Sequence, residues 1–369
     1  SLITRSSDGQ LMFLANKICK MKHDTKLGSR IAEVHNGSSL FTGDAGQGES
    51  NIRRWIIEND WLEAIVALPL NIFYNTGIAT YIWVLTNRKA PQRKGKVQLI
   101  DASAWFRPLR KNLGKKNCEL AEEDIKKVSD IFHLFKETPE SKIFPNEAFG
   151  YWKIVVERPL RLSVDLSTAN VNQFVHFCKD ADDEPLAKLV QRISKSLGAG
   201  THMDFNVFLK AVESDADEHN VKMTSKRQKL LESELAKKDE KAQPVIRKIH
   251  KADHIEANPV EGLFAVKIGG KEHIVEYEPD TDLRDTEQVP LMEDGGIEAF
   301  FRREVLPYVP DAWIDPRSAK IGYEISFTRY FYKPQQLRTL EEIRADIEKI
   351  EKESDGLLRS ILDISGGSR

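Results

Sequence analysis

"LEAIVALPLNIFYNTGIATYIWVLTNRK", residues 62–89, decides the fold of the N-terminal part of this sequence. Residues 62–70 are almost entirely apolar, and residues 78–85 form a second run with almost no polar break. A strand that is buried on both faces has such a continuous apolar run. Because the two runs follow one another, they predict a hairpin that turns the edge of a sheet antiparallel.

Helical and strand patterns alternate around this stretch. Asp8 precedes apolar residues at helical spacing, which predicts a helix over residues 8–22 with Asp8 as its cap. Residues 29–37 indicate a strand, residues 49–58 a helix and residues 96–103 a further strand. This order predicts the second half of an α/β sheet, whose first strands we expect upstream of Ser1.

The composition excludes several classes of protein. With 55 Lys+Arg against 57 Asp+Glu, the net charge of -2 gives no global sign of a nucleic-acid or membrane partner. No apolar run approaches the ~20 residues that cross a bilayer, so we expect no membrane association. Cys19, Cys118 and Cys178 lie far apart without a CxxC pair, which argues against disulfides and zinc and favours the cytoplasm.

After residue 103 the alternation stops. Residues 118–137 predict a helix, and residues 149–162 a strand that Pro159 closes. Residues 167–254 are mainly helical in pattern, with an exposed helix pair over 224–251, and residues 263–278 predict a β-hairpin that turns at Gly269 and Gly270. We therefore predict an α/β region (1–103), a basic linker with a connecting helix and strand (104–166), and a helical and hairpin region (167–369).

The link between the two apolar runs holds an aromatic pair, Phe73 and Tyr74, followed by Asn75. One interpretation is that the two rings complete a core. The other is that they await a planar ligand such as a nucleic-acid base, since an aromatic ring stacks on the face of a base while amides bind its polar edge.

Residues 88–116 are strongly basic, with ten Lys/Arg against the single acid Asp101. Such a run fits either a solvated surface or a patch that contacts phosphates, and the interleaved Trp105 and Phe106 keep the second interpretation open. The candidates for contact with a DNA backbone are Arg88, Lys89, Arg93 and Lys94.

Two other features are weaker candidates. Gly43, Gly46 and Gly48 lie between a strand and a helix, but their spacing is not that of a nucleotide-binding loop. A flexible loop over an active site, or an ordinary loop in which Glu49 or Ser50 caps the helix, fits better. His35 ends a strand and is either catalytic or structural. No metal-ligand or hydrolase motif is present, and we predict no metal site.

The C-terminal region predicts a long helix with a heptad-like apolar seam that Ser354 interrupts. The seam either packs within its own domain or contacts another subunit. Its members are Leu340, Ile343, Ile347, Ile350, Leu357 and Ile361.

Residues 29–89 resemble, almost end to end, the modification subunit of type I restriction-modification systems, an adenine-N6 DNA methyltransferase. The stretches "KGKVQLIDAS", "FGYWKIVVERPLRL", "VLPYVPDAWID" and "KIGYEISFTRYFY" resemble later parts of the same subunit. The resemblance implies the C-terminal half of a Rossmann-like methyltransferase sheet, followed by a mainly helical domain with a β-hairpin and a coiled-coil-like C-terminal helix.

The resemblance also implies a function. Enzymes of this family flip an adenine out of duplex DNA and transfer a methyl group from S-adenosylmethionine to N6. An aromatic residue that holds the flipped ring matches Phe73 best and Tyr74 second, with Asn75 as a positioning residue. The implied partners are double-stranded DNA, a specificity subunit that carries the DNA target, a second modification subunit and a restriction subunit.

The sequence departs from the family in two respects. No Asn-Pro-Pro-Phe or Asp-Pro-Pro-Tyr run occurs in it, and the Gly-rich cofactor motif expected before that run is missing. We therefore interpret the chain as the C-terminal part of the subunit and expect no catalytic residue in it and no activity from it alone. The alternatives are a non-catalytic remnant that binds DNA or another subunit, and a nucleotide-binding protein that uses Gly43 to Gly48.

Overall fold

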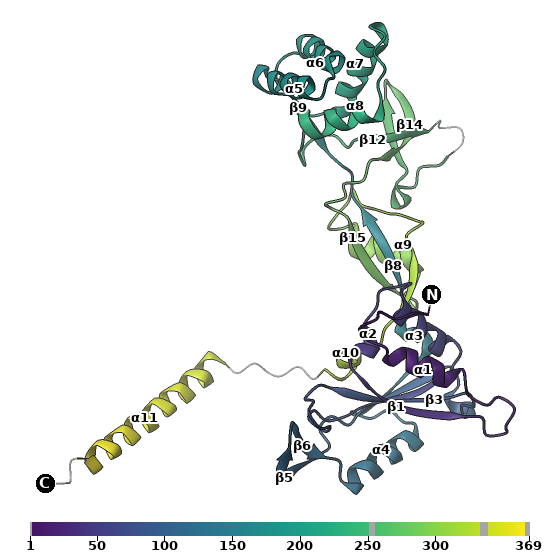
Figure 1. The fold of residues 1–369 in the computed structure, drawn as a ribbon, viewed down its shortest axis with the longest axis vertical. Coiled ribbons are helices and arrows are strands. Elements are labelled where there is room, and N and C mark those ends of the chain that lie inside the picture. The colour runs from purple at the N-terminus through teal and green to yellow at the C-terminus, as the bar shows by residue number, and fades with distance from the viewer. Residues whose placement is uncertain (1, 251–254, 333–338, 366–369) are drawn as a thin grey trace. The chain divides into compact units, whose positions relative to one another are not determined.

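The structure is a computed structural model that describes residues 2–250, 255–332 and 339–365, with side chains up to residue 354. Its contacts divide the chain into two units, Ser1–Ser326 and Phe327–Arg369, which are described separately. Figure 1 shows the labelled helices and strands. The region boundaries predicted at residues 103 and 166 stay predictions.

A five-stranded sheet organises the N-terminal part, in the order β1-β3-β2-β4-β7. All six residues of β2 are buried, as its apolar run predicts. The β2–β3 hairpin is antiparallel, which confirms that part of the prediction, but β3 is not at the edge because β1 also pairs with it. β4 is parallel to β2. The strands span Arg30–Asn36 (β1), Leu62–Ala67 (β2), Thr80–Thr86 (β3), Lys96–Asp101 (β4) and Ser141–Pro145 (β7).

Helices cover both faces of this sheet (Figure 1). The predicted helices appear as α1 (Gln10–Ile18) and α3 (Gly48–Glu58), with the short α2 (Ser38–Phe41) before α3. Leu11, Leu14 and Ile18 of α1 are buried. Gly9 occupies the N-cap position of α1, although the Asp8 carboxylate accepts a hydrogen bond from the Gln10 N–H at 3.3 Å.

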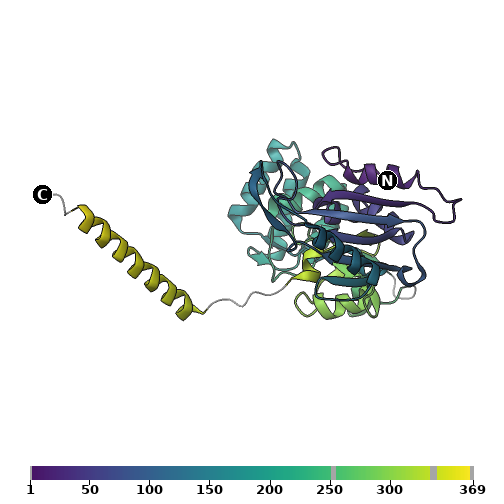
Figure 2. The same cartoon turned by 90° about the horizontal axis from the view of Figure 1, so that it is seen from below.

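The region expected to be a linker contributes to the same sheet. It holds the hairpin of β5 (Arg107–Leu113) and β6 (Lys116–Glu119), then α4 (Glu122–Leu134) and β7. Val128, Ile131 and Phe132 of α4 pack on Val66 and Ile100 of the sheet. From below, α4 lies in front of the strands (Figure 2). Two 3₁₀ turns are also present: η1 (Pro91–Arg93) precedes β4, and η2 (Asn146–Phe149) follows β7.

A second sheet is built around β8 (Gly150–Glu157), the strand expected before Pro159. Three strands pair antiparallel with β8: β15 (Asp285–Pro290), β16 (Trp313–Ile314) and β17 (Lys320–Tyr323). The helical turns α9 (Gly296–Phe300) and η5 (Phe301–Val305) supply Phe301 and Val305 to its core.

Four helices share one core with a small sheet. They are α5 (Thr168–Asp180), α6 (Glu184–Leu197), α7 (Phe205–Glu218) and α8 (Ser225–Leu230), which continues into the π-helical η3 (Leu231–Leu235). The sheet has the order β10-β9-β11, with bounds Thr201–His202 (β10), Leu162–Asp165 (β9) and Ala236–Lys238 (β11).

The exposed helix pair predicted over residues 224–251 is wrong. One short helix with its π turn ends at Leu235, and β11 and β12 (Ile246–His250) follow. Leu231 and Leu235 are buried in the core shared with α5 to α7, so tertiary packing overrides the charged helical pattern.

The hairpin predicted around Gly269 and Gly270 is confirmed as β13 (Phe264–Ile268) and β14 (Lys271–Tyr277). Both glycines have positive φ, 58° and 82°, as the tight turn requires. β12 extends the hairpin to three strands, and η4 (Pro259–Glu261) precedes it.

The fold is therefore mixed α/β, and the helical pattern expected after residue 167 appears as α5 to α8 with η3. The second unit contains α10 (Phe327–Phe331) and α11 (Leu340–Ser365), which confirms the predicted C-terminal helix. None of the helices in the described residues is long and apolar enough to cross a membrane.

Candidate nucleic-acid interface

The aromatic pair lies on the surface of the loop that joins β2 to β3. Phe73 is 38% exposed and Tyr74 64% exposed, so the interpretation that both rings complete a core is wrong. Asn71 and Asn75 flank the pair with φ of 57° and 58°, a conformation that asparagine tolerates better than most residues. These two bends place the rings at the outside of the loop.

The β5–β6 hairpin holds the base of this loop. The Lys116 ammonium donates to the carbonyl oxygens of Ile72, at 2.8 Å, and of Cys118, at 3.0 Å. The Cys118 thiol donates to the Leu70 carbonyl oxygen at 3.1 Å, and the Asn117 N–H donates to the Asn71 carbonyl oxygen at 3.2 Å. The hairpin therefore bonds several backbone acceptors of the loop. The sequence did not predict this, because no local pattern connects the two segments.

The tip of the hairpin meets the loop at Gly114. This glycine has a φ of 64°, and a Cβ at its position would lie 2.6 Å from Oδ1 of Asn75. The close approach places Asn75 between the aromatic pair and the basic hairpin.

Two of the four predicted DNA-backbone residues are buried, and this corrects the prediction. The Lys89 ammonium pairs with Asp60 at 2.5 Å and donates to the Lys96 carbonyl oxygen at 2.7 Å. Burial lowers the pKa of Lys89, and Asp60 opposes that effect. An amine held in this way is not available to a phosphate.

Arg93 is the second buried residue. Its guanidinium lies over the rings of Phe132 and Phe135, 4.2 and 4.3 Å from their centroids, and is 3.6 Å from the Glu63 carboxylate. Burial lowers the pKa of Arg93, while Glu63 raises it. Of the four predicted residues only Arg88 and Lys94 are exposed, and Arg88 donates to the His23 carbonyl oxygen at 2.7 Å.

His35 is a packed residue of β1. Its ring stacks on Trp83 with 5.5 Å between centroids, and its side chain is fully buried 3.7 Å from the Glu33 carboxylate. Burial lowers the pKa of His35, and the charge of Glu33 opposes this shift. The placement favours the structural interpretation of this histidine over the catalytic one.

The glycine-rich loop is occupied by the chain itself. A Cβ at Gly48 would lie 1.7 Å from the Ile3 carbonyl oxygen, and a Cβ at Gly43 would lie 2.8 Å from Cβ of Glu49. Neither Glu49 nor Ser50 caps α3, because the Glu49 carboxylate accepts from the Arg5 N–H at 3.0 Å and Gln47 holds the N-cap position. These glycines do not fit a nucleotide phosphate or S-adenosylmethionine.

Ser50 and Arg53 of α3 bind the backbone of a distant strand, a structural role that the sequence analysis did not predict. The Tyr323 N–H donates to the Ser50 hydroxyl at 3.0 Å, and Arg53 Nε donates to the Tyr323 carbonyl oxygen at 2.6 Å. Both residues share one helix face with Ile57, at spacings of three and four. Polar residues that recur on the apolar face of a helix could have predicted such buried hydrogen bonds.

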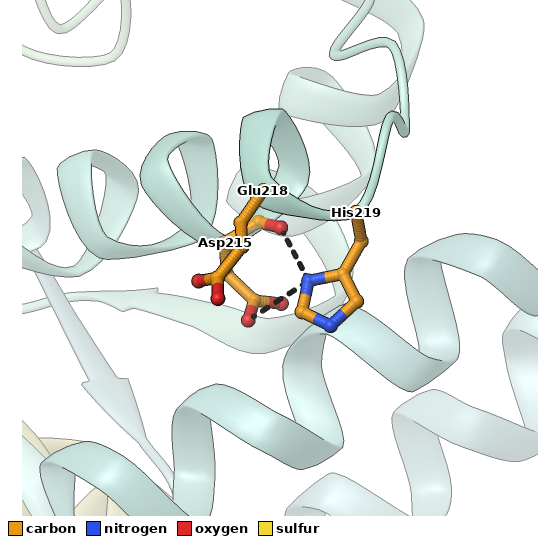
Figure 3. Close-up of side chains that lie close together, drawn as sticks. All are labelled: Asp215, Glu218 and His219. Atoms are coloured by element: carbon orange, nitrogen blue, oxygen red, sulfur yellow. Dashed lines mark hydrogen bonds and ion pairs between the residues drawn. The ribbon is translucent and has the colours of Figure 1, made fainter.

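A group of possible metal ligands occurs at the end of α7, where Asp215, Glu218 and His219 lie close together (Figure 3). Asp215 is already paired with the Arg192 guanidinium at 2.8 Å. His219 Nδ1 is 2.9 Å from the Asp215 carbonyl oxygen. These contacts account for the group as a helix-end ion pair, and it supports no metal site.

The C-terminal seam is apolar and exposed in the residues whose side chains the structure describes: Leu340, Ile343, Ile347 and Ile350. Leu357 and Ile361 belong to α11, but the structure does not describe their side chains.

A cavity of about 860 Å³ is lined by Leu160, Leu162 and Leu230 among other residues. Neither Phe73 nor Tyr74 lines it.

Comparisons with known proteins agree with the sequence resemblance. The sequence model of the N-6 DNA Methylase family matches residues 3–150. This region holds the sheet, the aromatic loop and the basic hairpin. The resemblance to the adenine-N6 DNA methyltransferase family is therefore confirmed for this part of the chain.

Within that family, the similar curated proteins are methylase subunits of type I restriction enzymes. The MjaIX subunit of Methanocaldococcus jannaschii is 38% identical over 110 residues, which cover 30% of this chain and 19% of that protein. The MpnII subunit of Mycoplasma pneumoniae is 36% identical over 89 residues, 24% of this chain and 15% of that protein. The matches thus span about a fifth of the length of these relatives.

A solved type I restriction-modification methyltransferase subunit from Streptococcus thermophilus is also similar. It is 24% identical, and the match covers 40% of this chain and 28% of that chain with a TM-score of 0.34.

Proposed function

We propose that this protein takes part in adenine-N6 methylation of DNA as a modification subunit of a type I restriction-modification system. The carrying observation is the exposed aromatic pair on the β2–β3 loop of the region that matches the N-6 DNA Methylase family. Phe73, with Tyr74 as second choice, stacks on an adenine that has left the duplex, and Asn75 positions the ring.

Base–aromatic stacking explains why exposed rings suit this role. A base that leaves its duplex loses its stacking partners. Stacking on a protein aromatic ring contributes ~1–3 kcal/mol of binding free energy per base in their place. The loop is held by Lys116 and Cys118 at its base, so little ordering entropy is lost when the base arrives.

In this proposal the methyl donor is S-adenosylmethionine. The glycines at 43 and 48 do not fit it, and we assign no described residue to its binding. The sequence contains no Asn-Pro-Pro-Phe or Asp-Pro-Pro-Tyr run, which in such enzymes accepts the hydrogens of the adenine amine. We therefore propose that the chain by itself transfers no methyl group. Turnover of labelled methyl groups by the pure chain contradicts this part of the proposal.

The partners in this proposal are double-stranded DNA, a specificity subunit, a second modification subunit and a restriction subunit. The exposed apolar residues of α11, Leu340, Ile343, Ile347 and Ile350, support a subunit contact. Removal of residues 340–369 then abolishes co-purification with the specificity subunit. Undiminished co-purification would place that contact elsewhere in the chain.

A binding assay tests the role of the loop. The probe is a duplex with one unpaired 2-aminopurine, whose fluorescence reports its stacking on a protein ring. Phe73→Ala is expected to weaken binding about 5- to 150-fold, the equivalent of ~1–3 kcal/mol. The matched control is Phe13→Ala on α1, since Phe13 is also an exposed phenylalanine. Equal binding by both variants would show that the loop holds no base, and binding without any fluorescence change would favour a non-catalytic DNA-binding protein.

A further inference from the structure

The β5–β6 hairpin carries a concentrated positive charge. Residues 109–117 include four cations, Arg110, Lys111, Lys115 and Lys116, and no acidic residue. Lys116 points to the loop and bonds the Ile72 carbonyl oxygen. The other three are exposed, and none of them forms an ion pair with a residue that the structure describes. Such a cluster attracts a polyanion, because each cation keeps its full charge at the surface.

The positive charge at the base of the hairpin is neutralised, unlike that at its tip. Arg107 pairs with Glu123 at the first turn of α4, which also contains Glu122 and Asp124. The available positive charge is therefore confined to the end of the hairpin. The register between β5 and β6 shifts between Pro108 and Leu113, the segment that contains Arg110 and Lys111. Between these positions the two strands leave the regular ladder, so Arg110 and Lys111 are not held in paired positions across it.

The same end of the hairpin adjoins the aromatic loop. Gly114 approaches the Asn75 side chain, and the Asn117 N–H donates to the Asn71 carbonyl oxygen at 3.2 Å. The segment that carries the cations is thus in direct contact with the loop that carries the exposed rings. A phosphate group and a base face are the two parts of a nucleotide that such a pair of features binds.

We propose that the end of the β5–β6 hairpin binds the DNA backbone beside the nucleotide whose base stacks on Phe73 and Tyr74. Arg110, Lys111 and Lys115 contact phosphates, and the anchored hairpin sets the distance between those phosphates and the stacking loop. This inference rests on the proposed function, which it extends by assigning the backbone contacts. It replaces Lys89 and Arg93, which are buried and already paired.

The test measures the salt dependence of DNA binding by the full chain. The probe is a fluorescein-labelled duplex, and the variant is Arg110→Ala/Lys111→Ala/Lys115→Ala. Each lost phosphate contact reduces the slope of log K against log salt by about 0.9, so the expected reduction is about 2 to 3. The control Lys195→Ala/Lys210→Ala/Lys222→Ala removes the same charge from exposed lysines elsewhere. Melting curves show that both variants are folded.

The outcomes separate this inference from the proposed function. A reduced slope in the hairpin variant, with an unchanged control, supports the inference. Charge-conserving Arg110→Lys/Lys111→Arg/Lys115→Arg is then expected to bind as the unchanged chain does. Equal slopes for both alanine variants overturn the inference while DNA binding, and the effect of Phe73→Ala, still stand. A chain that shows no binding to the duplex at any salt concentration overturns both.

Discussion

Arg53 donates a hydrogen bond from Nε to the backbone carbonyl oxygen of Tyr323 at 2.6 Å, across 270 residues of sequence. Its other nitrogens donate to the carbonyl oxygens of Ser39, at 3.1 Å, and Gly43, at 3.4 Å. One buried guanidinium therefore joins α3, the glycine-rich loop and β17. Because β17 belongs to the sheet around β8, this contact attaches that second sheet to the region that matches the N-6 DNA Methylase family.

Replacing Arg53 should destabilise the protein strongly. Arg53→Met leaves three carbonyl oxygens without this donor, and each unsatisfied buried acceptor costs about 1–3 kcal/mol. We expect a loss of at least ~3 kcal/mol in the free energy of unfolding, measured by urea titration. Arg54→Met is the matched control, because Arg54 is half-buried and, among the described residues, forms its ion pair with Glu58 one turn along. A loss equal to that of the control would contradict the role of Arg53.

Arg93 should act on stability rather than on DNA binding. Arg93→Ala removes the stacking on Phe132 and Phe135 and leaves the buried Glu63 with one cation fewer. The expected loss of unfolding free energy is about 2–4 kcal/mol. Lys94→Ala, at the exposed neighbour, should change it by less than about 0.5 kcal/mol. If Arg93→Ala folds normally and instead reduces the salt slope of DNA binding, the correction made for Arg93 is wrong.

Lys116 should control the mobility of the aromatic loop. Lys116→Met removes the donor to the carbonyl oxygens of Ile72 and Cys118. We expect faster amide hydrogen exchange over residues 70–77, because opening of this segment then breaks fewer contacts. The control is Lys115→Met, whose exposed side chain makes no such bond. Identical exchange in the two variants would show that the hairpin does not hold the loop.

His35 should make stability fall in mild acid. Burial lowers its pKa in the folded state below the ordinary 6.5, so below pH 6.5 the unfolded chain binds the proton more readily. The contribution is present above pH 6.5 and is lost as the pH falls through the folded-state pKa, by at most ~1.4 kcal/mol per pH unit. Urea titrations from pH 8 to pH 5 should show a smaller loss for His35→Phe. Parallel curves for the two proteins would mean that His35 is protonated equally in both states.

Much of the local structure was predictable because it follows from apolar spacing and turn residues. The β2–β3 pair, the helices α1 and α3, and the hairpin at Gly269 and Gly270 all appear near their expected positions. Where the predictions failed, a distant segment decided the outcome. Residues 224–251 have a charged helical pattern, yet Leu231 and Leu235 enter a core that they share with α5 to α7 and with β9.

The candidate site shows the same division. The aromatic pair and the basic run were both visible in the sequence, but which cations are available was not. In the sequence, Lys89 and Arg93 cannot be distinguished from Lys94. Only in the structure does Lys89 pair with Asp60, and Arg93 with Glu63 and Phe132, which makes both unavailable to DNA.

The sequence by itself determined the β2–β3 pair, the helices α1 and α3 and the hairpin at Gly269 and Gly270, and it carried the resemblance to the adenine-N6 DNA methyltransferases. Tertiary structure alone decided that β3 lies between β1 and β2, that Phe73 and Tyr74 face outward, and that the β5–β6 hairpin holds their loop. The physical reason is that local spacing sets which side chains favour burial, whereas pairing and charge neutralisation depend on groups that only folding brings within a few ångströms.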